Sequence, residues 1–193
     1  MLRKTVLLAV LALALPITAL ANSIDFANQG GTVTGSNAGL TFSSTLIGAV
    51  NLGGSSFFGS NLGTLTLTTG ALTSGSLGSG ATFGGGTITI AGNGSNGIPT
   101  GTLFTGTFTS AKWTFEGTLA NGTHQYLLTA TLAGGVGFTF QSAVDTGKGF
   151  FSGTGTIESG DTNVVVPEPG TLSLLGTGLI GLAGVIRRKL NIS

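Results

Sequence analysis

Alternation of apolar and polar residues dominates the middle of the chain. Residues 64–68 read Thr-Leu-Thr-Leu-Thr, and the same period of two returns at 87–90 and 137–140. Successive side chains of a strand point to opposite faces, so this period indicates strands with one apolar face. Residues 22–165 are therefore predicted to form an all-β body of short strands rich in glycine, threonine and serine. Antiparallel strands of this kind pack as a β-sandwich or close into a barrel-like sheet.

The segment 111–133 predicts a β-hairpin with a defined register. Two alternating runs flank Asn121-Gly122, a dipeptide that favours a two-residue turn. Such a turn pairs Ala120 with Thr123 and thereby fixes every other pair. The expected pairs on the apolar face are Trp113 with Ala130, Phe115 with Leu128, Gly117 with Tyr126, and Leu119 with His124. A second hairpin is expected to turn through residues 145–149.

Residues 1–21 have the three parts of a secretory signal peptide. Arg3 and Lys4 precede an apolar run of ten residues, and Ala19-Leu20-Ala21 supplies the small residues of a cleavage site. Ten residues rise only about 15 Å as a helix, which is half of a ~30 Å hydrocarbon core. We expect a transient signal that is cleaved after Ala21, and a mature chain that begins at Asn22.

A second membrane-directed element follows the body at 166–190. Residues 171–186 carry no charge, and Arg187, Arg188 and Lys189 follow directly. Such a segment reaches about 24 Å as a helix, which is short of a ~30 Å core, and its four glycines weaken that helix. Basic residues stay on the cytoplasmic side, so 171–186 is expected to form a marginal transmembrane helix with the body outside.

The residues around that helix carry a family resemblance. Val166-Pro167-Glu168-Pro169, the glycine-punctuated apolar run and the basic stop at 187–189 occur in this order, with a signal peptide at the other end. The arrangement resembles the PEP-CTERM sorting signal of exported bacterial proteins, over about 25 of 193 residues. Tails of this type are also catalogued under an ice-binding protein C-terminal label, which describes the tail and not the body. The body is not assigned to a family.

The resemblance implies a partner and a route. The partner is an exosortase, a membrane transpeptidase-like enzyme that would cut near Pro167-Glu168-Pro169. The expected route passes through an inner-membrane intermediate, with transient membrane contact, and ends at the cell surface or outside the cell. Bacteria with this system usually make exopolysaccharide or biofilm matrix, so exopolysaccharide is a further candidate partner.

Charge excludes some partners of the body. Charged residues make up 7% of the chain, against roughly 25% in typical soluble domains. Five of the seven basic residues lie in the two ends, so the body holds five acidic and two basic residues, a formal net charge of −3. Nucleic-acid binding is not expected, because it depends on neutralising phosphates. The chain has no cysteine, which excludes disulfides and thiolate metal sites.

Catalytic and metal-binding signals in the body are sparse. His124 is the only histidine. It could act as a general base or a metal ligand, although a structural role at the sheet margin fits better. Two of the carboxylates Asp145, Glu158 and Asp161 could meet to bind Ca²⁺ together with backbone carbonyls, but no loop has the usual ligand spacing. Two G-x-G-x-x-G matches lack the strand–helix context of a dinucleotide site. No catalytic residue, cofactor or metal is therefore expected.

Three functions remain open, in decreasing order of preference. The first is a non-enzymatic exported protein of the cell surface or the extracellular matrix. The second is a carbohydrate-binding or adhesive module in which aromatic rings stack on sugars, although core packing is the commoner use of such rings. The candidate rings are Phe57, Phe58, Trp113, Tyr126, Phe150 and Phe151. The third is an exported hydrolase.

Overall fold

The computed structural model describes residues 22–132 and 138–166. Most of this part belongs to one compact unit, Ser23–Val166. The predicted signal peptide, with Ala19 and Ala21, lies outside the described residues. So do Pro167, Glu168 and Pro169, the predicted helix 171–186 and the basic stop 187–189. No helix of the described part has the length and apolar character that a membrane crossing requires.

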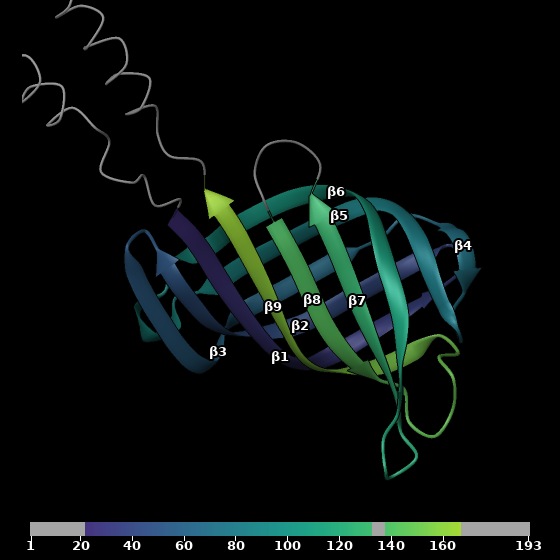
Figure 1. Ribbon diagram of the computed structural model, residues 1–193. Coiled ribbons are helices and arrows are strands. Elements are labelled where there is room, and N and C mark those ends of the chain that lie inside the picture. Colours follow the sequence, from purple (N-terminus) through teal and green to yellow (C-terminus); the bar gives the residue numbers. More distant parts are fainter. Residues whose placement is uncertain (1–21, 133–137, 167–193) are drawn as a thin grey trace, which may run out of the picture. The chain divides into compact units, whose positions relative to one another are not determined.

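The described body consists of nine strands. They are β1 (Asn22–Ser36), β2 (Gly39–Leu52), β3 (Ser55–Thr68), β4 (Leu72–Ser76), β5 (Gly80–Asn93), β6 (Thr100–Thr118), β7 (His124–Leu132), β8 (Phe138–Asp145) and β9 (Thr154–Val166), with a short 3-10 turn, η1 (Ser95–Gly97), before β6. Neighbouring strands follow the order β3-β2-β1-β9-β8-β7-β6-β5-β4 (Figure 1). β3 also pairs with β5, so eight strands close into a ring. β4 pairs with the first residues of β5, ahead of the part of β5 that pairs with β3. The prediction of an all-β antiparallel body is confirmed in its barrel-like form.

The strands are longer than the sequence pattern indicates. β6 has 19 residues and β1 has 15, whereas strands of globular proteins usually have about 3–10. The prediction of short strands is wrong because glycines that resemble turn residues lie inside the strands. Gly63, at φ 149°, is one of them, and a Cβ there would overlap the carbonyl oxygen of Ala91 on β5. Glycine therefore permits the close approach of β3 and β5 where the ring closes.

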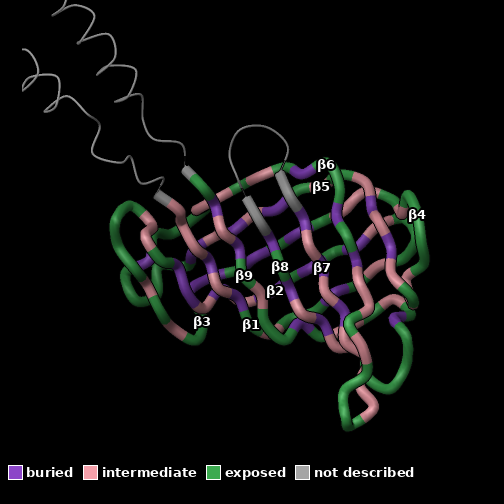
Figure 2. Tube along the Cα trace, in the orientation of Figure 1, coloured by how far each residue is buried: buried purple, intermediate pink, exposed green. Residues whose placement is uncertain are grey.

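Apolar side chains from all eight ring strands fill the inside of the closed sheet, and buried and exposed positions alternate along the strands (Figure 2). Trp113 of β6 and Tyr126 of β7 are fully buried and stack with ring centroids 4.7 Å apart. The Trp113 indole Nε1 donates a hydrogen bond to the Leu77 carbonyl at 3.0 Å. The Tyr126 hydroxyl donates to the Gly78 carbonyl at 2.7 Å. The polar atoms of both rings are thus satisfied by the β4–β5 loop.

The β6–β7 hairpin turns where predicted but pairs in a different register. Its loop has three residues, 120–122. Gly122 has φ 85° and donates its N–H to the Leu119 carbonyl at 2.8 Å. This geometry is that of a three-residue turn closed by a glycine bulge. A second bulge lies between Phe115 and Gly117. The observed pairs are Trp113 with Leu128, Phe115 with Tyr126, Gly117 with Gln125, and Thr118 with His124. The four predicted pairs are wrong, but at Trp113 the shift is two residues, so this side chain keeps its inward direction.

The second predicted hairpin has a longer loop than the sequence suggests. Its loop runs from the end of β8 to the start of β9, so Phe150 and Phe151 lie in a loop and not in a strand. The Phe151 side chain is buried, and its N–H donates to the Tyr126 hydroxyl at 3.2 Å. At the other end of the loop, Gly35 of β1 donates its N–H to the Gly153 carbonyl at 2.9 Å. The β8–β9 loop therefore covers the end of the closed sheet near Tyr126.

Candidate functional site

An ordered array of hydroxyl side chains covers the outer face of β1, β2, β3, β5 and β6. One row across these strands consists of Thr34, Thr41, Thr68, Thr87 and Thr107, each paired with the next. The adjacent row consists of Thr32, Ser43, Thr66, Thr89 and Thr105, paired in the same way. Thr89 is half-buried and the others are exposed. These ten residues are called the threonine array below.

The alternation that fills the core also builds the array. Between its two rows lie Val33, Phe42, Leu67 and Ile88, which pair across the same strands and are buried. Neighbouring strands lie about 4.8 Å apart, and alternate residues of one strand about 6.7 Å apart, so the hydroxyl groups repeat in two directions. Threonine is β-branched and has few χ1 rotamers, which restricts where each hydroxyl can lie. The hydroxyls of Thr68 and Thr87 are hydrogen-bonded at 3.1 Å.

Charged residues are absent from the part of the chain that forms most of the array. Residues 26–111 contain none, and this stretch includes all of β2, β3, β4 and β5. The charged residues of the body are Asp25, Lys112, Glu116, Asp145, Lys148, Glu158 and Asp161. The strand preference of threonine accounts for its place in a sheet, but not for the absence of charge over so long a stretch. The array is thus an uncharged surface covered by hydroxyls.

The array is not among the features expected from the sequence, although the sequence carries a signal for it. Thr-x-Thr repeats occur at 32–34, 64–68, 87–89 and 105–107, all within the uncharged stretch. Each repeat indicates only that one strand has a hydroxyl face. The alignment of the repeats into rows depends on pairing between distant segments, such as β3 with β5, and that pairing has no local signature.

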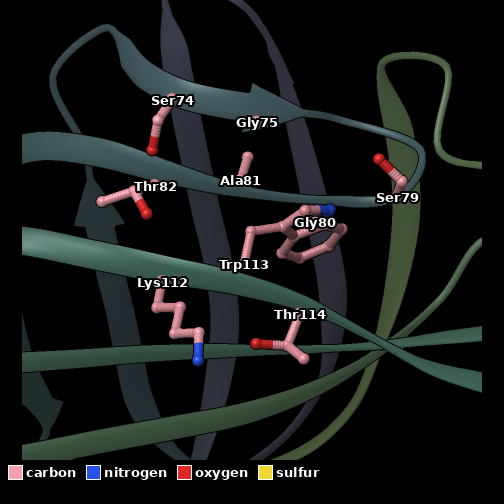
Figure 3. Close-up of a pocket in the computed structure, with 9 residues that line it drawn as sticks. All are labelled: Ser74, Gly75, Ser79, Gly80, Ala81, Thr82, Lys112, Trp113 and Thr114. Carbon is pink, nitrogen blue, oxygen red and sulfur yellow. The ribbon is translucent and has the colours of Figure 1, made fainter.

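A shallow groove of about 270 Å³ crosses β4, β5 and β6. Figure 3 shows the hydroxyls of Ser74, Thr82 and Thr114 and the ammonium group of Lys112 around it. The buried Trp113 also lines the groove. Histidine, aspartate and glutamate are not among the residues that line it. It offers hydroxyl groups and one cation for weak polar binding.

The predicted carboxylates form two separate pairs. Glu158 shares a side-chain hydrogen bond with Asp145 and accepts one from Gln125 Nε2 at 2.9 Å. Three effects raise the pKa of Glu158. The hydrogen bond with Asp145 has the largest effect, followed by burial and by the negative charge of Asp145. Asp161 lies beside Asp25 instead, where burial first and the charge of Asp25 second raise the pKa of Asp161. Two of the predicted carboxylates, Asp145 and Glu158, therefore meet, whereas Asp161 lies with Asp25. Among the described residues no three His, Asp or Glu side chains come together.

His124 packs as a ring at the covered end of the closed sheet. Its ring centroid lies 4.7 Å from that of Phe150 and 5.5 Å from that of Phe115. The backbone N–H of His124 donates to the Gly147 carbonyl at 2.8 Å. Its Nδ1 is buried and has no hydrogen-bond partner among the described residues. The imidazole therefore lacks the carboxylate at Nδ1 that a catalytic triad would need.

The aromatic residues considered for sugar stacking do not form one platform. Trp113, Tyr126 and Phe151 belong to the core. Phe58 is 64% exposed and lies beside η1, where Asn96 Nδ2 donates to its carbonyl oxygen at 2.8 Å. Phe150 is 60% exposed and lies in the β8–β9 loop. Two exposed rings on separate segments give no continuous stacking surface.

Comparison with known proteins identifies the C-terminal segment. Residues 165–189 match the family model described as the PEP-CTERM protein-sorting motif, and they include Val166-Pro167-Glu168-Pro169 and the basic stop. The chain is therefore an exported protein with a β-sheet body. More particularly, its tail carries a PEP-CTERM motif, which implies targeting by exosortase and export through the membrane to the cell surface. No curated protein and no solved structure matches the chain.

Proposed function

We propose that this protein is a non-enzymatic component of the cell surface or extracellular matrix, released from the inner membrane by exosortase cleavage. The sorting motif at 165–189 carries the proposal. The described body supports the non-enzymatic part: its histidine packs among phenylalanine rings, and its groove is lined by hydroxyls and one lysine.

The order of events follows from the chain's segments. Residues 1–21 are expected to direct the chain across the inner membrane, and the helix predicted for 171–186 is expected to hold it there. A helix of this sequence is expected to be a weak anchor, because sixteen residues rise about 24 Å against a ~30 Å core and four of them are glycine. Pro167 and Pro169 favour an extended backbone before the predicted helix, which would leave the motif accessible to a processing enzyme. Cleavage near Pro167-Glu168-Pro169 then releases the body.

The closed sheet suits a protein that works outside the cell without disulfides. The chain has no cysteine, so the body depends on its core and its backbone hydrogen bonds. Because β3 pairs with β5, each of the eight ring strands has a partner on both sides. A closed sheet of this kind removes the exposed edges at which secreted β-proteins aggregate.

The experiment replaces Pro167, Glu168 and Pro169 by alanine and follows the protein in the producing bacterium. The parent should lose its last ~25 residues and leave the inner membrane, and the triple variant should accumulate there uncut. Mass spectrometry of the mature C-terminus locates the cleavage. A control with Thr171→Ala and Ser173→Ala changes the predicted helix but leaves Pro167-Glu168-Pro169 intact and should be processed normally. An intact 187–189 tail on the parent at its final location would refute processing and leave a plain anchor.

A further inference from the structure

We propose that the threonine array binds an uncharged polysaccharide. The array repeats one chemical group along rows that cross five strands, for example from Thr34 through Thr68 to Thr107. Steps along a row are about 4.8 Å, which is close to the length that one pyranose ring adds to an extended glycan chain. A ligand that uses such a surface must itself be repetitive, and a polysaccharide chain meets each strand with about one sugar unit.

The charge distribution selects a neutral polymer. Residues 26–111 carry no charged side chain, so most of the array has neither a cation for a uronate or sulfate group nor an anion for an amino sugar. Anionic ligands are usually held by arginine or lysine, which form short, charge-assisted hydrogen bonds with them. The lysines of the body, Lys112 and Lys148, lie outside the array. Hydroxyl-to-hydroxyl contacts therefore dominate the expected interface.

Threonine matches both chemical faces of a sugar ring. Its hydroxyl can donate one hydrogen bond and accept others, as a sugar hydroxyl does. Its methyl group, on the same stiff side chain, can contact the C–H groups of the ring. The bond between Thr68 and Thr87 holds two hydroxyls in place before any ligand arrives. Little side-chain entropy is lost on binding to such a surface, which favours affinity.

The curvature of the sheet favours a flexible chain over a flat crystalline surface. The array occupies five of the eight strands that close the ring, so it extends round more than half of the circumference. Closing a sheet of eight strands requires it to curve continuously. A rigid plane, such as the face of an ice crystal, could touch only a few of the strands at once. A polysaccharide chain can follow the curve.

This inference goes beyond the proposed function, because it names a ligand class and a face of the body. It rests on residues of β1 to β6 and not on the sorting tail. A binding measurement on purified protein therefore stays valid if exosortase processing fails, and a failed binding measurement leaves the processing proposal untouched.

The experiment measures retention of the full-length chain, purified in mild detergent, on uncharged polysaccharides (dextran, cellulose and agarose) and on the uronate polymer alginate. Retention is expected on at least one neutral polymer and is expected to resist 1 M salt, because charge screening weakens only ionic contacts. The array variant Thr66→Val/Thr68→Val keeps the β-branched shape and removes two hydroxyls. Loss of two hydrogen bonds should weaken binding roughly tenfold.

The matched control is Thr154→Val/Thr156→Val, which makes the same chemical change at two exposed threonines of β9, outside both the array and the groove. It should bind as the parent does, with thermal unfolding used to show that both variants fold. Failure to bind any neutral polymer, or retention on alginate alone, would overturn the proposal. So would equal losses in both variants, because the two hydroxyls of the array would then matter no more than two elsewhere on the surface. Inhibition of ice recrystallisation without polysaccharide binding would assign the array to ordered water instead.

Discussion

Replacing Trp113 by alanine tests the core that the alternation of β6 builds. Trp113 is fully buried, stacks on Tyr126 at 4.7 Å and meets the Phe151 ring edge-on at 5.1 Å. Truncation of a buried tryptophan costs about 3–5 kcal/mol through lost apolar contacts and the cavity that remains. It also leaves the Leu77 carbonyl without the indole donor, which adds about 1 kcal/mol. We expect a loss near the upper end, about 4–5 kcal/mol.

Urea denaturation followed by far-UV circular dichroism is the suitable assay. Trp113 is the only tryptophan, so its fluorescence disappears with the mutation. Because natural domains have only about 5–15 kcal/mol of stability, Trp113→Ala could unfold the protein, and Trp113→Phe then serves as the second variant. It keeps a stacked ring and should lose about 1–2 kcal/mol with the hydrogen bond. Lys112→Ala, at an exposed neighbour, should cost less than about 1 kcal/mol. Equal losses at positions 112 and 113 would refute the inward direction of Trp113.

Two further predictions concern buried polar groups and the carboxylate pairs. Thr162 is fully buried and its hydroxyl has no partner among the described residues, so Thr162→Val should stabilise the protein by up to about 1 kcal/mol in urea denaturation. Ser142→Ala removes a hydroxyl that donates to the Ser159 carbonyl and should destabilise it instead. The raised pKa of Asp161 means that the native state holds this proton more tightly than the unfolded state does. The resulting stabilisation is present below the ordinary aspartate pKa of 3.8 and is lost as pH rises through the native pKa. Asp161→Asn should therefore raise the urea midpoint at pH 7 and reduce the gain in stability on acidification, and an unchanged pH dependence would contradict this.

The class of fold could be predicted because its signal is local. Strands with one apolar face are visible at 64–68 and 87–90 without knowledge of any partner strand. The choice between a β-sandwich and a closed ring could not be made, since closure depends on the pairing of β3 with β5, which leaves no mark in either strand alone. The glycine contact at Gly63 is intelligible only after that pairing is known.

The register of the β6–β7 hairpin shows the same limit at a finer scale. Asn121-Gly122 correctly marks the turn, but a loop of two or three residues is compatible with this dipeptide. The bulge beside Gly117, at φ 147°, adds a further shift. Of the candidate site residues, the burial of Trp113 follows from alternation alone. The partnership of Asp161 with Asp25 does not, because it joins the last strand to the first.

Closure of the sheet and the absence of charge in the array depend on each other. A protein of low net charge lacks the repulsion that keeps chains apart, and open strand edges would then promote association. In the described sheet only β4, with five residues, ends the strand order without a second partner. The strands of the ring can therefore carry threonine at positions where an open sheet would need lysine to prevent association at its edges. Conversely, both rows of the array cross the β3–β5 pair between Thr68 and Thr87 and between Thr66 and Thr89. Opening the ring at Gly63 would divide the array as well as expose two edges, so fold stability and the proposed binding surface rest on the same contact.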